Sequence, residues 1–367
     1  MGKVRNIYAA GNTARGYYHF YESVLQNLER LFILQGGPGT GKSSLIKAIG
    51  EEMMERGYEI EWIHCPSDNH SVDGVIIAGL KVGIVDGTAP RVIKSNAPGA
   101  VEEYVDIGTA WDVSYLRAHK VNIMQLNDAV GRAFQKAYDA FAQALRIHDE
   151  WERFYIENMN VVEANKVTDE VIERIIGEQV LPKAATVRRM FLGAATPEGP
   201  VDHIQNLTED IAKRYFIKGR PGSGKSTMLK KLAAVAEQRG YNVEIYHCGL
   251  DPHSLDMVII PEKSIAIFDS TAPHEHFPTR DSDEIIDMYT RLIAPGTDEK
   301  YAAELQEIKA KYSAVMKEGT AYLAEAKAIH DERKNIYAEA TDFGKVKVIQ
   351  SNILSKIDSL IISVENQ

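Results

Sequence analysis

The chain contains two copies of one pattern, and this duplication constrains the fold more than any single motif does. When the sequence is compared with itself at an offset of 183 residues, residues 36–90 align without a gap on residues 219–273, and nearly half of the aligned positions are identical. A repeat of this length has the size of a domain and not of a solenoid unit. The sequence therefore predicts two tandem domains, at 1–183 and 184–367.

Each copy alternates apolar runs with amphipathic segments, which is typical of an α/β fold. The apolar runs stop at polar or glycine-rich loops, and the amphipathic segments place apolar residues three and four positions apart. We expect each domain to be a mainly parallel sheet flanked by helices. The expected strands and helix lie at 30–35, 44–56 (helix), 59–64 and 81–85, and again at 214–218, 227–239 (helix), 242–247 and 264–268.

After the third expected strand, each copy continues into a long segment rich in Ala, Glu and Lys, at about 111–177 and at about 298–361. Fifty residues of unbroken helix would extend roughly 75 Å. A break near 159–161 in the first copy and near 341–344 in the second would divide each segment into two helices. We therefore predict a helical hairpin insert in each domain.

Both copies contain the motif G-x-x-x-x-G-K-[ST] between an apolar run and an amphipathic segment. Its glycines let backbone N–H groups face a phosphate, and the N-terminus of the next helix adds positive charge. The lysine reaches the β- and γ-phosphates, and the serine after it ligates Mg²⁺. The sequence predicts two ATP sites, in which Lys42 and Lys225 act in catalysis. The expected binding residues are Gly36, Gly37, Pro38, Gly39, Thr40, Gly41, Lys42, Ser43 and Ser44, and Gly219, Arg220, Pro221, Gly222, Ser223, Gly224, Lys225, Ser226 and Thr227.

The third expected strand of each copy ends in an aspartate, Asp86 or Asp269. An aspartate at this place beside a P-loop usually holds Mg²⁺, the Walker-B role. We expect one Mg²⁺ at Ser43 and Asp86 and a second at Ser226 and Asp269. The alternative is that each aspartate caps the turn that follows its strand.

The loop after the second expected strand has the same polar residues in both copies. In a P-loop kinase, an acidic residue here often orients the acceptor hydroxyl, so Asp68 and Asp251 are candidate catalytic residues. The alternative is that both begin a turn and that Ser71 and Ser254 cap a short helix after it. A zinc site from the preceding His-Cys pairs is less favoured, because neighbouring residues of a strand point to opposite faces. These pairs are His64-Cys65 and His247-Cys248.

The pattern His-Asp-Glu-x4-Tyr occurs in both helical segments, beginning at His148 and at His330. The histidine and the tyrosine are seven residues apart and so share one helix face. One interpretation is a histidine within a helix–helix seam. The other is a residue that contacts nucleotide or substrate when the helices close over the site.

Composition excludes several classes of protein. Lys and Arg number 42 against 52 for Asp and Glu, a net charge of −10, so nucleic-acid binding through a broad basic surface is not expected. Two cysteines cannot form a disulfide framework. No apolar stretch is long enough to span a membrane, and the first residues lack the apolar region of a secretory signal. We expect a cytoplasmic protein that makes no membrane contact.

The motif set resembles a family of bacterial ATP-binding proteins with two P-loops, known mainly as predicted ATPases without an assigned substrate. The resemblance covers essentially the whole chain and rests on GxPGxGKS, H-C-x-x-D, S-x-D and D-[GS]-T-A-P, each present twice. It implies tandem P-loop NTPase domains that bind ATP and Mg²⁺. ATP is favoured over GTP because residues 165–168 have Thr where the guanine motif N-K-x-D needs Asp.

The leading interpretation is a Mg²⁺-dependent ATPase whose two domains act as an intramolecular pseudo-dimer. A kinase for a small molecule or nucleotide is the first alternative, and a nucleotide-switched scaffold that binds a protein partner through its helical segments is the second. The copies differ after the Thr-Ala-Pro motif, where Arg91 of the first copy aligns with His274 of the second, so the two sites can differ in activity. Candidate arginine fingers are Arg91, Arg117, Arg220 and Arg280.

Overall fold

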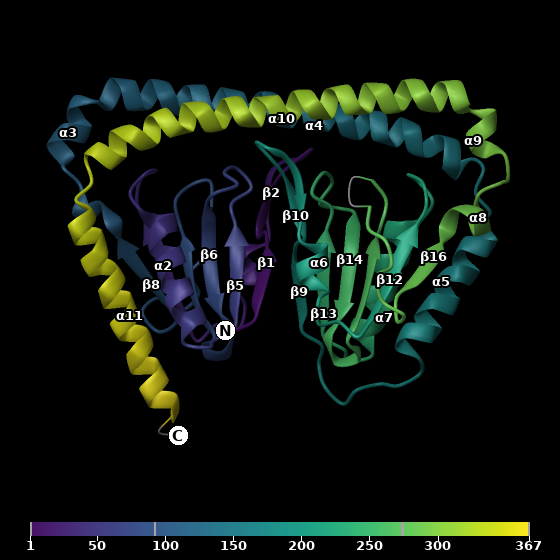
Figure 1. The fold of residues 1–367 in the computed structure, drawn as a ribbon, viewed down its shortest axis with the longest axis horizontal. Helices are drawn as coiled ribbons and strands as arrows, with labels where there is room; N and C mark the ends of the chain where they lie inside the picture. Colours follow the sequence, from purple (N-terminus) through teal and green to yellow (C-terminus); the bar gives the residue numbers. More distant parts are fainter. Residues whose placement is uncertain (1, 92, 273–274, 366–367) are drawn as a thin grey trace.

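The computed structural model describes residues 2–91, 93–272 and 275–365. Two α/β units lie side by side, and a pair of long helices crosses above both of them (Figure 1). The two mainly parallel six-stranded sheets with flanking helices confirm the prediction of a mixed α/β fold in two tandem units. No helix in the described part of the chain is both long and apolar enough to cross a membrane.

The first sheet has the strand order β1-β5-β6-β7-β4-β8, and only β6 runs antiparallel to its neighbours. Its central strands are apolar on both faces, because the residues of each face are buried in an apolar core. The strands are β1 (Val4–Ile7), β4 (Arg30–Gln35), β5 (Ile60–His64), β6 (Val72–Ile77), β7 (Val82–Asp86) and β8 (Glu102–Asp106).

The second sheet repeats this order in the second copy, with β14 as the antiparallel strand. In each sheet the strand before the G-x-x-x-x-G-K-[ST] motif lies between two parallel neighbours, which brings the motif to the carboxyl edge of the sheet. The motif segments at 36–44 and 219–227 are called the P-loops below, after the sequence pattern alone. The strands are β9 (Val187–Phe191), β12 (Lys213–Lys218), β13 (Val243–His247), β14 (Leu255–Ile260), β15 (Ile265–Asp269) and β16 (Glu284–Asp287).

Shorter elements complete each unit. A two-stranded hairpin follows the first strand of each copy and contacts the hairpin of the other copy. The hairpins are β2 (Ala10–Thr13) with β3 (Gly16–His19), and β10 (Gly193–Thr196) with β11 (Gly199–Asp202). The α-helices are α1 (Tyr21–Val24), α2 (Lys42–Glu55), α3 (Val113–Ala118), α6 (Ile204–Leu207), α7 (Lys225–Gln238), α8 (Met288–Leu292) and α9 (Thr297–Lys300). Three 3₁₀ turns lie at Ala78–Leu80, Ile107–Ala110 and Pro261–Lys263.

The long helices are α4 (Lys120–Ile156) and α10 (Ala302–Glu339), which pack against each other along their length (Figure 1). The helical segments are interrupted close to the predicted positions, before α5 (Val161–Ile176) and α11 (Phe343–Glu365). The predicted hairpin within each insert is wrong, because α4 pairs with α10 of the other copy. Both inserts carry the same apolar stripe, so the stripe itself does not distinguish a partner in the same copy from one in the other.

The two helices that follow these breaks are exchanged between the units. Helix α5, from the first half of the chain, buries Val171 and Ile175 in the core of the second sheet. Helix α11, from the second half, buries Ile353 and Ile357 in the core of the first sheet. The halves 1–183 and 184–367 therefore each contribute a helix to the unit built by the other.

The two units meet at their first strands. The backbone groups of Tyr8 and Phe191 exchange hydrogen bonds of 3.1 and 2.9 Å, and an apolar core extends across the contact. Arg188 forms a charged pair with Glu61 across the same interface, and a pair at the matching positions of the other copies lies beside it. The interface thus repeats its contacts about an approximate two-fold axis.

Candidate functional site

The first P-loop lies between the end of β4 and the start of α2. Gly39 and Gly41 have φ values of 71° and 85°, which glycine adopts without strain. The Lys42 ammonium group is buried and donates hydrogen bonds to the carbonyl oxygens of Gly36 and Gly37. Thr40 closes the loop through a 2.9 Å bond from its hydroxyl to Gly37. The loop therefore wraps around its own lysine.

Asp86 lies beside this lysine at the end of β7. Its carboxylate is 3.9 Å from the Lys42 ammonium group, and it also accepts a 2.9 Å hydrogen bond from the backbone N–H of Thr88. Thr88 in turn donates a 2.7 Å hydrogen bond to the carbonyl oxygen of Gly36. Asp86 therefore caps the turn after its strand, as the alternative interpretation predicts, and also lies beside the P-loop lysine; its role in holding Mg²⁺ stays a prediction.

The second P-loop has the same geometry. Gly222 and Gly224 have φ values of 75° and 86°, and the Lys225 ammonium group donates a 2.9 Å hydrogen bond to the carbonyl oxygen of Arg220. Asp269 lies 3.5 Å from Lys225 and accepts hydrogen bonds from Thr271. The sequence motif is therefore built into the same local structure twice.

The serine after each lysine also has equivalent contacts. The Ser43 hydroxyl oxygen accepts a 3.0 Å hydrogen bond from the N–H of Val72, and Ser226 accepts one of 2.9 Å from Leu255. These contacts tie the start of each P-loop helix to the antiparallel strand of its sheet. Ser44 and Thr227, one residue further on, are exposed.

Each P-loop is covered by the long helix of the other copy. A Cβ atom on Gly222 would lie 2.7 Å from the carbonyl oxygen of Glu152 on α4, and one on Gly39 would collide with the backbone at Lys334 on α10. Only glycine permits this close approach. Around the first P-loop, the two long helices and the β5–β6 loop enclose a cavity of about 720 Å³.

The two loop aspartates are held by charged partners and by turns. Asp68 accepts hydrogen bonds from the Ser71 hydroxyl and from the N–H of His70, and pairs at 2.6 Å with Lys334. These contacts outweigh partial burial and lower the pKa of the Asp68 carboxyl to about 2. Asp251 caps the equivalent turn and pairs at 2.8 Å with Arg15. Their contacts are those of turn residues that also join the two copies.

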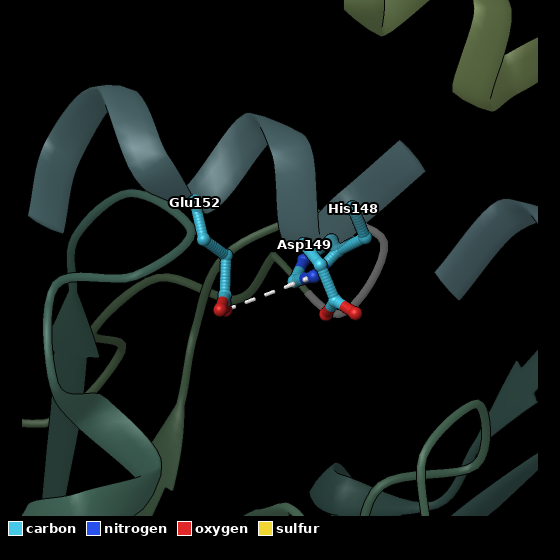
Figure 2. A group of neighbouring side chains, drawn as sticks. All are labelled: His148, Asp149 and Glu152. Carbon is cyan, nitrogen blue, oxygen red and sulfur yellow. Dashed lines mark ion pairs between the residues drawn. The ribbon is translucent and has the colours of Figure 1, made fainter. Parts of the chain in front are cut away.

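The histidine pattern of α4 lies near the second P-loop. His148, Asp149 and Glu152 have metal-ligating atoms within 4.8 Å of one another (Figure 2), and the His148 ring lies 3.7 Å from the Glu152 carboxylate. Burial lowers the pKa of His148, and the charges of Lys225 and Asp269 also act on it. The His148 ring also contacts Tyr312 of α10, so His148 lies in the seam between the long helices and close to the second P-loop.

The His-Cys pairs after β5 and β13 do not converge. The His64 ring bonds to the Asn6 side chain at 2.8 Å, and burial lowers its pKa to about 4. Burial also raises the pKa of the Cys65 thiol to about 12. The His247 ring is 2.6 Å from the carbonyl oxygen of Pro252. Within the described residues, these side chains form no group of three metal ligands.

The four arginines proposed as fingers occupy different environments. Arg91 is partly buried at the first P-loop and pairs with Asp73 and Asp86 at 2.5 and 3.5 Å. Arg220 pairs with Asp298, and Arg280 bonds to backbone carbonyl oxygens away from both P-loops. Arg117 is exposed on α3. His274, which differs from Arg91 in the repeat alignment, lies outside the described residues, as does Pro273.

The sequence analysis missed Arg333 and Lys334, which line the cavity at the first P-loop from α10. A signal for them was present. Alignment of His330 on His148 places Arg333 on Trp151 and Lys334 on Glu152. The second copy thus has a positive charge where the first has an uncharged ring, and a positive charge where the first has a negative one.

Comparison with family models, with curated proteins and with solved structures finds no match to this chain. The residues themselves therefore carry the functional argument. A buried ammonium group held by carbonyl oxygens at the N-terminus of a helix fits a polyphosphate ligand. A serine hydroxyl and a carboxylate at the same loop fit the oxygen ligands that Mg²⁺ prefers. Ser43 with Asp86 and Ser226 with Asp269 provide such oxygens.

Proposed function

We propose that the protein binds Mg²⁺-ATP at two P-loop sites and hydrolyses it, with the two α/β units acting as an intramolecular pseudo-dimer. The observation that supports this most is the repeated pair of P-loop lysine and strand-end aspartate, at 3.9 Å for Lys42 and Asp86 and 3.5 Å for Lys225 and Asp269. Each pair lies beneath a helix contributed by the other copy. Because each proposed site is covered by a long helix of the other copy, hydrolysis at one site would be coupled to a movement of the two copies relative to each other.

The chemistry follows from the position of these groups. Lys42 and the loop N–H groups would hold the phosphates, while Ser43 and Asp86 would hold Mg²⁺, which neutralises phosphate charge when bound. A water oxygen forms a bond to the γ-phosphorus, and the bond from that phosphorus to the bridging oxygen breaks. ADP leaves with the electron pair, and the protons of the water pass to the released phosphate and to solvent.

Kinase activity is the second candidate, because the cavity of about 720 Å³ extends beyond the P-loop to Tyr17, Phe134 and Tyr138. Such space would accommodate an acceptor beside ATP. Asp68 favours hydrolysis instead, since its carboxylate is already engaged by Lys334 and by its own turn. The scaffold alternative predicts nucleotide binding with negligible turnover.

The test is phosphate release from ATP by the purified full-length protein with Mg²⁺ and no acceptor. We expect slow release that is lost when EDTA replaces Mg²⁺ and when Lys42→Ala is combined with Lys225→Ala. Lys230→Ala, an exposed lysine on α7, is the matched control. Binding without release would favour the scaffold. Release that appears only when one metabolite becomes phosphorylated would favour the kinase.

A further inference from the structure

Arg333 lies at the first P-loop, although it belongs to the second copy. It projects from α10 into the wall of the cavity that contains Lys42, Asp86 and the P-loop glycines. Its guanidinium group donates hydrogen bonds to the Asn127 side-chain oxygen and, at 2.7 Å, to the His330 ring. Neither partner is an anion: Asn127 is an amide, and burial and nearby cations lower the pKa of His330 to about 4, which leaves its ring neutral near pH 7.

The other cationic side chains that line this cavity each have a carboxylate close by. Within the described residues, Arg333 forms no ion pair, and its Nε atom is buried without a hydrogen-bond partner. The carboxylate partners of the others are Asp86 for Lys42 (3.9 Å), Asp73 for Arg91 (2.5 Å), Asp331 for Lys327 (2.6 Å) and Asp68 for Lys334 (2.6 Å).

Arg333 is partly buried and so loses part of its hydration without gaining an anion from the described residues, although its charge cannot be neutralised. Its charge reaches the P-loop: burial lowers the pKa of Lys42, the positive charges of Arg91 and Arg333 lower it further, and Asp86 and Asp73 act in the opposite direction. The described residues that line the cavity carry more cations than carboxylates, namely Lys42, Arg91, Lys327, Arg333 and Lys334 against Asp68, Asp73 and Asp86.

We propose that Arg333 is a catalytic residue of the first site, an arginine finger that the second copy supplies to the first P-loop and that contacts the transferring phosphoryl group. This inference rests on the proposed ATP hydrolysis. As the γ-phosphorus is released from the bridging oxygen and bonds to water, negative charge spreads over its oxygens. A guanidinium group held by Asn127 and His330 stabilises that charge without having to reorganise.

The second site lacks the equivalent group. At the matching place on α4, Trp151 replaces Arg333 and packs into the core of the second unit. Glu152 replaces Lys334, and its carboxylate lies beside His148 (Figure 2). A carboxylate here opposes the charge that develops in phosphoryl transfer. The second P-loop is therefore a site that binds nucleotide and turns it over slowly or not at all.

The first experiment compares wild-type protein with Arg333→Ala, Arg333→Lys and the control Arg146→Ala, an exposed residue of α4. We expect Arg333→Ala to lower kcat by about 100-fold or more, with little change in KM, and Arg146→Ala to behave as wild type. Arg333→Lys keeps the charge but loses the planar fork, so it should restore only part of the rate.

A binding measurement separates catalysis from structure. ADP should bind Arg333→Ala and wild type with affinities within about threefold, whereas ADP with aluminium fluoride, which mimics the transferring phosphoryl group, should bind the variant at least about tenfold more weakly. Equal loss of both ligands would mean that Arg333 only supports the fold, and would overturn the inference.

Two further outcomes distinguish the inference from the proposed function. Wild-type protein that neither binds ATP nor releases phosphate would overturn both. Full hydrolysis by Arg333→Ala or Arg333→Lys, or equal loss of hydrolysis in Lys42→Ala and Lys225→Ala, would overturn the inference while the proposed function stands. We expect Lys42→Ala to lower hydrolysis more strongly than Lys225→Ala does.

Discussion

Arg5 of the first copy donates hydrogen bonds of 2.9 and 2.6 Å to the carboxylate of Glu244 in the second copy. The equivalent pair, Arg188 and Glu61, lies beside it, and Arg5 also approaches Glu61 at 3.8 Å. Four charges thus balance each other across one interface. Removing one carboxylate would leave two partly buried arginines with a single acidic partner, so the stability of the network depends on all four charges.

We therefore expect Glu244→Ala to lower the free energy of unfolding by about 2–3 kcal/mol, measured by urea unfolding. Combining it with Arg5→Met should recover much of this loss, because the uncompensated charge is then removed. The control is Lys3→Ala, which breaks an exposed pair with Asp210. An additive effect of Glu244→Ala and Arg5→Met would contradict the network.

Because α5 and α11 are exchanged, a substitution in either helix should destabilise the unit built by the other half of the chain. Ile357 on α11 is fully buried against the first sheet, so Ile357→Ala should lower hydrogen-exchange protection of β4 and α2. Ile175→Ala on α5 should instead affect β12 and α7. Each substitution should cost about 2–5 kcal/mol by leaving a cavity. Loss of protection in the unit of the same half would contradict the exchange.

Nucleotide stoichiometry tests both P-loops at once. The protein should bind two ATP per chain in the presence of Mg²⁺, and Lys42→Ala and Lys225→Ala should each weaken one site about 10- to 100-fold, since a charged hydrogen bond to phosphate is lost. Isothermal titration calorimetry with a non-hydrolysable ATP analogue measures both values. One site in the wild type would show that only one loop binds.

The aspartates test the Mg²⁺ assignment. Asp86→Asn and Asp269→Asn should each lower the apparent Mg²⁺ affinity about 10- to 100-fold while leaving binding of metal-free ATP nearly unchanged. The amide can still accept the hydrogen bonds from Thr88 and Thr271. Unchanged Mg²⁺ dependence in the double variant would assign these residues to turn capping alone.

Buried histidines predict how stability depends on pH. Burial is the main cause that lowers the pKa of His64, His247 and His330 to about 4 each, against about 6.5 when unfolded. Between these values the unfolded state binds more protons, so stability should fall as the pH drops from 6.5 to 4. The slope is at most about 1.4 kcal/mol per pH unit for each histidine. Urea unfolding at several pH values checks this, and His64→Gln with His247→Gln should flatten the slope, whereas the exposed His70→Gln should not.

Much of the fold could be predicted because duplication displays every signal twice. The apolar runs gave the strands, and the P-loop motif placed Lys42 and Asp86 together at one sheet edge. The short helix expected after Ser71 and Ser254 is wrong, because Val72–Ile77 and Leu255–Ile260 form the antiparallel strands β6 and β14. A short apolar run does not distinguish a strand from a buried helix segment. The partners of the long helices were also missed, because the same stripe can pair within a copy or between copies. Arg333 was overlooked for that reason: it lies 291 residues after Lys42, and only the pairing of α4 with α10 brings it to the loop.

The long helices α4 and α10 give each proposed nucleotide site residues from both halves of the chain. In an assembly of two identical subunits, a substitution would appear at both sites and could not favour one of them. Here every position occurs once, so the first site can keep Arg333 and Lys334 while the second has Trp151 and Glu152. Joining two such copies in one polypeptide thus frees the two candidate sites to differ, as the proposed division between turnover at the first and retention of ligand at the second requires.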